Sequence, residues 1–239
     1  MKLIIDTAEK VASLAADHYT EVLAQKPAAV LGLATGSTPL GLYAELIRRN
    51  QAGQIQFDRV TTFNLDEYVG LDASHDQSYR YFMNENLFKH INIRQAHTHV
   101  PSGLDTSSEA ACAYDAAIEA AGGIDIQLLG IGNNGHLGFN EPNTPFGSTT
   151  HVVELTASTR EANQRFFQSL DEVPTHAVTM GLKTIMNAKS IILMALGEAK
   201  APIVKKMVQG DVTPLVPASI LQLHPNVEIY LDHAAASLL

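Results

Sequence analysis

Short apolar runs recur along the chain and alternate with longer segments in which apolar residues have helical spacing. The apolar runs predict strands at residues 1–6, 28–34, 60–66, 124–132, 151–156, 189–197 and 226–232. The segments between them predict helices at residues 6–25, 40–53, 76–91, 106–123, 158–170 and 198–210. The run 28–34 is apolar throughout, which is typical of a strand buried on both faces.

This alternation predicts an α/β fold, a doubly wound and mostly parallel sheet with helices on both faces. The sequence contains no internal repeat, low-complexity tract or shift in composition that indicates a boundary. We therefore expect a single domain over residues 1–239. Residues 139–150 form the longest irregular segment, and loops of that length in compact domains are often functional.

Composition and charge narrow the classes of partner. Hydrophobic residues make up 46% of the chain. The net charge is −9, and the resulting negative potential disfavours binding to nucleic acid and to anionic membranes. The first apolar stretch is too short for a signal peptide, so we expect a cytoplasmic protein. The single cysteine, Cys112, rules out a disulfide within the chain and is expected to be a small buried residue on a helix.

The stretch GIGNNG, residues 130–135, has the spelling of a dinucleotide-binding turn. That reading requires a helix to begin within the motif. The following residues, HLGFNEPNTPFGSTT, are rich in helix breakers, so the helix dipole that would hold a pyrophosphate is absent. The loop instead offers His136 and Glu141, which are either an acid–base pair or a structural hydrogen bond.

The ends of other predicted strands also carry polar residues. Thr35-Gly36-Ser37-Thr38-Pro39 follows the run 28–34, and its amides and hydroxyls suit an anion at a helix start. The alternative is an ordinary helix start, capped by Ser37 or Thr38 with Pro39 in the first turn.

Acidic and basic residues follow three further predicted elements. Asp66 and Glu67 end the run 60–66 and are either a solvated turn or the place of a catalytic base. Lys200 begins a helix and is either an ordinary exposed lysine or part of an anion site, because a bound anion explains a cation there better than helix stability does. Arg160 and Arg165 lie on the helix after the long loop and suit phosphate. Together these strand ends indicate an enzyme acting on a small phosphorylated substrate.

Five segments together resemble the glucosamine-6-phosphate deaminase family, and they run in order through nearly the whole chain: LGLATGSTPLGLY, FNLDEYVGL, GIGNNGHLGFNEP, STREANQRFF and SILQLHP. The resemblance implies a Rossmann-like α/β fold, no metal and no redox cofactor. It also implies conversion of D-glucosamine 6-phosphate and water to D-fructose 6-phosphate and ammonia, in amino-sugar catabolism.

The same resemblance implies a role for each candidate. Asp66 would be the base that moves a proton between C2 and C1, and His136, oriented by Glu141, would open the sugar ring. The family's ring-opening group includes the residue that here is Asn134, where some relatives have aspartate. The phosphate would be held by Gly36, Ser37 and Thr38 with Arg165 and Lys200. An asparagine cannot carry charge, so the pKa of His136 is expected to lie lower than in aspartate-bearing relatives.

The chain resembles the shorter branch of the family, so we expect a monomer, with a homo-oligomer as the alternative, and weak or absent allostery. His151 stands where allosteric members place an arginine for their activator. Two other functions fit part of the pattern: a 6-phosphogluconolactonase-like hydrolase and a non-catalytic sugar-phosphate sensor. The first is expected to have an arginine after the acidic pair, where this chain has Tyr68. The second needs a DNA-binding module that the α/β pattern leaves no room for.

Overall fold

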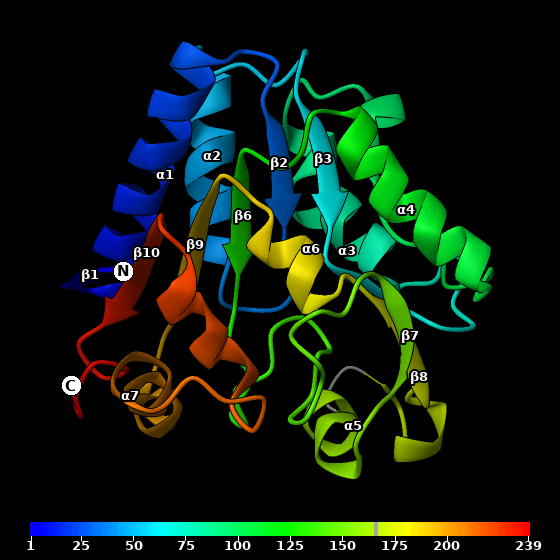
Figure 1. The fold of residues 1–239 in the computed structure, drawn as a ribbon. Helices are drawn as coiled ribbons and strands as arrows, with labels where there is room; N and C mark the ends of the chain where they lie inside the picture. Colours follow the sequence, from blue (N-terminus) through cyan, green and yellow to red (C-terminus); the bar gives the residue numbers. More distant parts are fainter. Residues whose placement is uncertain (165–166) are drawn as a thin grey trace.

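A computed structural model describes residues 1–164 and 167–239. Its main sheet has seven parallel strands in the order β1-β10-β9-β6-β2-β3-β5 (Figure 1). These strands are β1 (Lys2–Asp6), β2 (Val30–Leu33), β3 (Thr61–Asn64), β5 (Thr98–His99), β6 (Ile126–Leu129), β9 (Ser190–Ala195) and β10 (Val227–Asp232). Every residue of β2, β6 and β9 is buried, which confirms the prediction of a parallel sheet covered on both faces.

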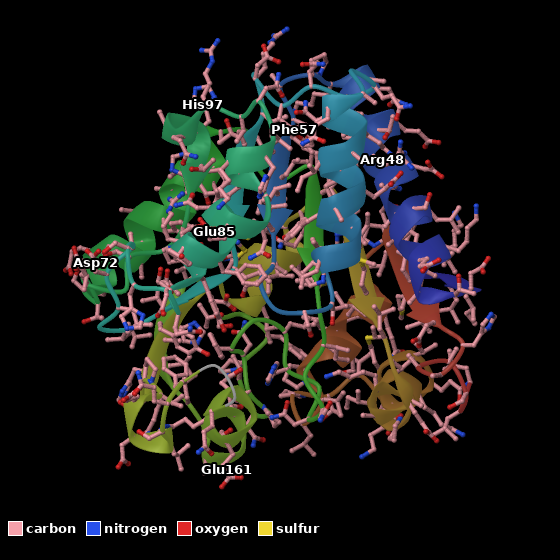
Figure 2. The ribbon with its side chains drawn as sticks, turned by 180° about the vertical axis from the view of Figure 1, so that it is seen from behind. Arg48, Phe57, Asp72, Glu85, His97 and Glu161 are labelled. Carbon is pink, nitrogen blue, oxygen red and sulfur yellow. The ribbon has the colours of Figure 1, made fainter. Side chains whose placement is uncertain are left out.

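Helices cover the two faces of this sheet. Figure 2 shows α2 and α3 on the rear face, with α1 packed beside α2 and against β10. Figure 1 shows α4 and α6 on the front face and α7 below the sheet. The helices are α1 (Ala8–Gln25), α2 (Leu40–Gln51), α3 (Tyr79–Asn86), α4 (Ser108–Ala120), α5 (Ala157–Asn163), α6 (Leu182–Met186) and α7 (Ala201–Gln209). None of those in the described ranges is long and apolar enough to cross a bilayer.

A second sheet was not predicted. It is antiparallel, in the order β4-β8-β7, with β4 at Asp66–Tyr68, β7 at His151–Glu154 and β8 at His176–Thr179. The predicted strand 60–66 therefore splits at Leu65. Its amide donates to the Leu33 carbonyl of β2 (3.1 Å), while its own carbonyl accepts from the amide of Met180, beside β8 (2.7 Å). One residue thus passes the chain from the large sheet to the small one.

Cys112 corrects another prediction, because its side chain is exposed rather than buried. The buried residues of α4 are Ala111 and Ile118, seven positions apart on one face. Cys112 follows Ala111 directly, so it is turned about 100° away from that face. Helical position, rather than residue type, decides its exposure.

Candidate active site

The large sheet reverses its winding between β2 and β6, which are neighbours at its centre. From β2 the chain moves toward β3 and β5, whereas from β6 it moves toward β9 and β10. Ligands of doubly wound sheets bind at such a point, outside the carboxyl ends of the strands. The turn at Thr35–Pro39 follows β2 and the loop at Gly130–His136 follows β6, so both lie at this edge.

The Thr35–Pro39 turn leaves the start of α2 open. Pro39 is the N-cap residue, and no side chain in the described part of the chain caps the helix, so the predicted cap by Ser37 or Thr38 is wrong. A Pro side chain has no group that could accept a hydrogen bond from the first amides, and the Ser37 side chain is exposed instead. A twelve-residue helix whose uncapped, positive dipole end lies at a strand terminus suits an anion.

Asp66 is buried, with 6% of its surface exposed. Among the described residues, none forms a hydrogen bond with its carboxylate. Burial, with a smaller effect of the neighbouring charge of Glu67, raises the pKa of Asp66 to about 8. An acid with a free carboxylate and a pKa near neutrality suits proton transfer to and from carbon.

Glu67 has different surroundings, although it is buried as deeply as Asp66. Its carboxylate accepts hydrogen bonds from the amides of Tyr68 (2.9 Å), Tyr79 (2.8 Å) and Arg80 (2.9 Å). Burial raises its pKa, and these three amides oppose that change. Glu67 therefore joins β4 to the first turn of α3, and the acidic pair is not a solvated turn.

The loop after β6, residues 130–150 and called here the histidine loop, brings His136 and Glu141 together. His136 Nδ1 lies 3.5 Å from Glu141 Oε1. The hydroxyl of Thr159 also donates to Oε1, at 2.5 Å. Burial alone would raise the pKa of Glu141, but the close contact with the His136 ring and the hydrogen bonds from Thr159 and Asn134 lower it to about 2. Glu141 is thus an ionised, fixed partner for the imidazole.

The Asn134 side chain forms hydrogen bonds with both Glu141 and His136. Its Nδ2 donates to Glu141 Oε2 at 2.5 Å, and its Oδ1 accepts from the His136 amide at 3.2 Å. Gly132 faces the imidazole, because a Cβ at that position would lie 2.3 Å from His136 Nε2. Asn134 therefore orients both members of the pair.

Asp66 lies close to the loop that carries His136. A Cβ added at Gly138, two residues after His136, would lie 3.3 Å from Asp66 Oδ2 and 2.8 Å from Thr179 Oγ1. Thr179 pairs with Asp66 across the small sheet and accepts a hydrogen bond from the Phe139 amide at 3.0 Å. The small sheet thus brings Asp66 against the loop of His136.

Lys200 reaches the same loop from the end of β9. Its Nζ donates to the Ile131 carbonyl and to Asn133 Oδ1, each at 2.8 Å. Of the two candidate arginines, Arg160 donates to the carbonyls of Leu170 (2.9 Å) and Val173 (3.1 Å), which gives it a structural role. Arg165 lies outside the described residues, so its part in holding a phosphate stays a prediction.

Tyr79 is a site residue that the sequence did not reveal, because nothing in the local pattern distinguishes it from the other aromatic residues of the predicted helix 76–91. Its ring stacks on Phe139 with 6.1 Å between centroids and lies 4.8 Å from that of Tyr68. Burial raises its pKa well above the usual value, and its hydroxyl interacts with Thr35 and Tyr68. Tyr79 therefore joins the Thr35–Pro39 turn, β4 and the histidine loop.

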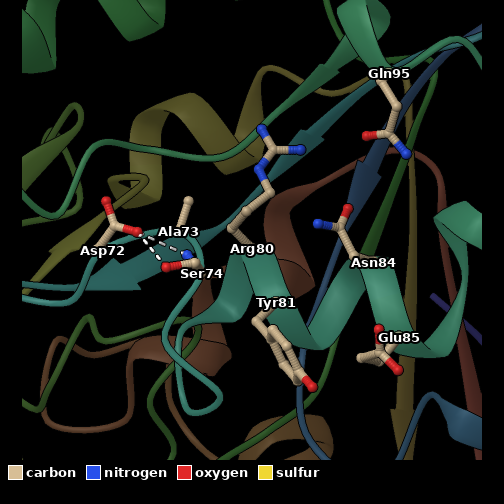
Figure 3. Close-up of a pocket in the computed structure, with 8 residues that line it drawn as sticks. All are labelled: Asp72, Ala73, Ser74, Arg80, Tyr81, Asn84, Glu85 and Gln95. Atoms are coloured by element: carbon tan, nitrogen blue, oxygen red, sulfur yellow. Dashed lines mark hydrogen bonds between the residues drawn. The ribbon is translucent and has the colours of Figure 1, made fainter.

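Figure 3 shows a different hollow, a pocket of about 580 Å³ over α3. Its lining contains none of the predicted site residues. Two carboxylates, Asp72 and Glu85, line it, and the Arg80 guanidinium already donates to Thr98 Oγ1 (2.8 Å) and to the Thr98 carbonyl (2.9 Å). This pocket does not suit a phosphorylated ligand.

Comparison with known proteins places this geometry in a family. The family model for glucosamine-6-phosphate isomerases/6-phosphogluconolactonase matches residues 5–229. The chain belongs to this family. It is also 53% identical over 241 residues to a glucosamine-6-phosphate deaminase of Clostridium perfringens, covering 100% of both chains.

Solved structures of the isomerase/lactonase family agree with the fold. A structure described as a monomeric glucosamine-6-phosphate deaminase matches with a TM-score of 0.97 and 44% identity, covering 100% of both chains. The 6-phosphogluconolactonase of Trypanosoma brucei matches with a TM-score of 0.78 and 19% identity over 100% of this chain and 98% of that one, a likeness of fold alone. These relatives confirm the resemblance that the five sequence segments indicated.

Within the family, the lactonase alternative departs from this chain at Tyr68. That position, where a lactonase is expected to carry an arginine, holds a tyrosine with 2% of its surface exposed. Its ring packs against Phe139 at 5.7 Å and Tyr79 at 4.8 Å. An arginine there would put a charge into an apolar cluster, at a large cost in desolvation.

Proposed function

We propose that the chain is a glucosamine-6-phosphate deaminase, which converts D-glucosamine 6-phosphate and water to D-fructose 6-phosphate and ammonia. The observation that carries the proposal is the Asp66 carboxylate, buried and without a hydrogen-bond partner in the described chain, beside the loop of His136 and Glu141. The shared name of relatives at about half identity supports the substrate.

In the proposed reaction, His136 first moves the proton that opens the sugar ring, while Glu141 keeps the imidazole oriented. In the open chain the amino group is protonated. Asp66 then takes the proton from C2, while O1 of the aldehyde gains a proton that the ammonium group gives up, which forms an enediol-like intermediate. Asp66 returns its proton to C1. This leaves a protonated imine at C2. Water adds to that carbon, and ammonia departs as the C–N bond breaks.

The phosphate does not react, and its binding positions the sugar for these steps. In the proposal, the Gly36–Thr38 backbone and hydroxyls hold it at the start of α2, with Lys200 and Arg165. Two observations support this assignment. The start of α2 has no side-chain cap, and the Lys200 Nζ binds the loop after β6, the strand that pairs with β2. The site residues are proposals that rest on placement and chemistry.

The test is ammonium release from glucosamine 6-phosphate by the purified protein, without added metal or nicotinamide. We expect turnover with glucosamine 6-phosphate and no hydrolysis of 6-phosphogluconolactone. Lactone hydrolysis without ammonium would favour the lactonase alternative, for which the shared fold is the supporting observation. Binding without turnover of either compound would favour the sensor.

We further propose that the protein is a monomer of 25.8 kDa, because the structural neighbour at 44% identity is described as monomeric. Light scattering coupled to size exclusion measures this mass directly. The expected lack of allostery is checked in the same ammonium assay, by adding N-acetylglucosamine 6-phosphate at low substrate concentration. The cytoplasmic location stays a prediction.

A further inference from the structure

The SILQLHP segment, residues 219–225, contributes to the family resemblance but takes no part in the proposed chemistry. Its first residue, Ser219, is fully buried. The Ser219 hydroxyl accepts from the Thr213 amide (2.8 Å) and donates to the Thr213 carbonyl (3.0 Å). These two bonds close residues 213–219 into a tight loop, called here the 213–219 loop.

The 213–219 loop contacts the histidine loop at two places. The Ala218 amide donates to the Gly135 carbonyl at 2.9 Å, and the Pro214 carbonyl accepts from the Asn143 amide at 2.8 Å. Val216 also lies against Gly135, since a Cβ there would be 2.9 Å from Val216 Cγ1. One contact comes directly before His136, and the other comes two residues after Glu141.

The first contact fixes the peptide group that carries His136. This group joins the Gly135 carbonyl to the His136 amide. The Ala218 amide holds its oxygen, and Asn134 Oδ1 holds its hydrogen. A planar peptide held at both ends has little freedom to tilt, so the direction of the His136 side chain is fixed as well.

The second contact holds a strained residue. Asn143 has a φ of 74°, in the left-handed region, which is sparsely populated for residues other than glycine. Its hydrogen bond to Pro214 offsets part of that cost. The segment after Glu141 therefore keeps its course because the 213–219 loop accepts the Asn143 amide.

We propose that Ser219 is a positioning residue for the reaction: by closing the 213–219 loop, it fixes the backbone on both sides of the His136–Glu141 pair. The proposal rests on the proposed function. Ser219 contacts neither His136 nor Glu141 itself, and acts through Gly135 and Asn143.

The experiment compares steady-state kinetics of ammonium release for wild type, Ser219→Ala and a matched control, Ser190→Ala. The Ser190 hydroxyl is also buried and donates to a backbone carbonyl, that of Asp125, at 3.0 Å. Ser190 lies at the amino end of β9, however, whereas the candidate site lies at the carboxyl ends of the strands. Assays are run well below the unfolding temperature of each variant. We expect kcat of Ser219→Ala to fall about tenfold or more with KM within about twofold, because small misplacements of reacting groups are costly. Ser190→Ala should keep wild-type kcat.

Val216→Ala provides a second variant in case Ser219→Ala does not fold. Val216 is only partly buried, so its truncation is expected to leave the protein folded while loosening the contact with Gly135. It should lower kcat severalfold, again with little change in KM.

The outcomes separate the two proposals. A wild type that releases no ammonium overturns the proposed function, and with it the role of Ser219. An active wild type with unchanged kcat in folded Ser219→Ala, or in Val216→Ala if the first variant is unfolded, overturns the positioning role alone. Equal losses in Ser219→Ala and Ser190→Ala would show a general effect of stability and would also overturn it.

Discussion

At the scale of single residues, Asp66 and Glu67 show how surroundings divide the work of two adjacent acids. Both are buried, but three backbone amides occupy Glu67, whereas no described residue donates to Asp66. A carboxylate that is satisfied by the backbone is committed to structure, and one that is not keeps its basicity for a ligand. The sequence shows two acids in a row and cannot show this difference.

Asp66→Asn should therefore remove the proposed base while keeping the shape of the side chain. We expect kcat for ammonium release to fall about a hundredfold or more, the usual size of a general-base effect. Asp76→Asn, the same change at a carboxylate with 72% of its side chain exposed, is the control and should behave as wild type. Full turnover by Asp66→Asn would contradict the assignment.

The raised pKa of Asp66 also predicts the pH dependence of stability. Between the unfolded value of about 4 and the folded value of about 8, the folded protein holds a proton that the unfolded chain has released. The contribution of Asp66 to the free energy of unfolding therefore falls as pH rises through this window.

Asp66→Asn removes that loss, so its stability relative to wild type should increase from pH 5 to pH 8. Urea denaturation at several pH values measures the difference. A constant difference across this range would mean that the pKa of Asp66 is not raised. The Asp66 carboxylate would then not lower the free energy of unfolding in this pH range.

At the scale of elements, the connection from β4 to α3 depends on Glu67. Glu67→Gln replaces one accepting oxygen with a donor group, which faces either the amides of Tyr68 and Tyr79 at the Oε1 position or the amide of Arg80 at the Oε2 position. We expect the free energy of unfolding to fall by about 1.5–3 kcal/mol, the range for hydrogen bonds to a charged group.

The control for Glu67→Gln is Glu85→Gln on α3, the helix whose first turn Glu67 contacts. Glu85 pairs with Lys89 at the surface, with 41% of its side chain exposed, so its loss should change stability by about 0.5 kcal/mol or less. Urea denaturation compares the two variants with wild type. Equal stability changes for both would show that the amide bonds of Glu67 matter no more than a surface pair.

At the scale of the whole molecule, the sequence predicted six of the seven strands of the large sheet, because each of the six lies in one of the predicted apolar runs. It missed β5, which has only two residues, Thr98 and His99. It also placed the turn after β2, the loop after β6 and Lys200 at one edge, and the structure brings them there. The strands of the small sheet are only three or four residues long, and the pairing of β4 with β8 joins residues more than a hundred positions apart. No local pattern encodes such pairing.

The contacts of the 213–219 loop with Gly135 and Asn143 were equally hidden, because they are made by backbone groups that every residue has. The hydrogen bonds become visible only in the structure, where folding brings these backbone groups next to each other. The roles of Tyr79 and Ser219 follow from the same kind of arrangement. Sequence reasoning thus found the side chains that we propose to carry the chemistry, but not the backbone contacts that position them.

The site spans both sheets, because Asp66 begins β4 while the open helix start follows β2. A sugar phosphate that contacts both should oppose local opening of the small sheet. We expect fructose 6-phosphate at about 100 times its Kd, without ammonium, to slow amide hydrogen exchange in β7 and β8 by up to about a hundredfold. Inorganic phosphate should protect only the start of α2. Equal protection by both ligands would place the whole ligand on the large sheet.

The exposed position of Cys112 has a practical consequence for such measurements. It is the only thiol in the sequence and lies on the outer side of α4. A maleimide dye or spin label will therefore attach at a single known point of the unmutated protein. Together with a second, engineered cysteine, it provides a fixed reference from which ligand-dependent distances can be followed in solution.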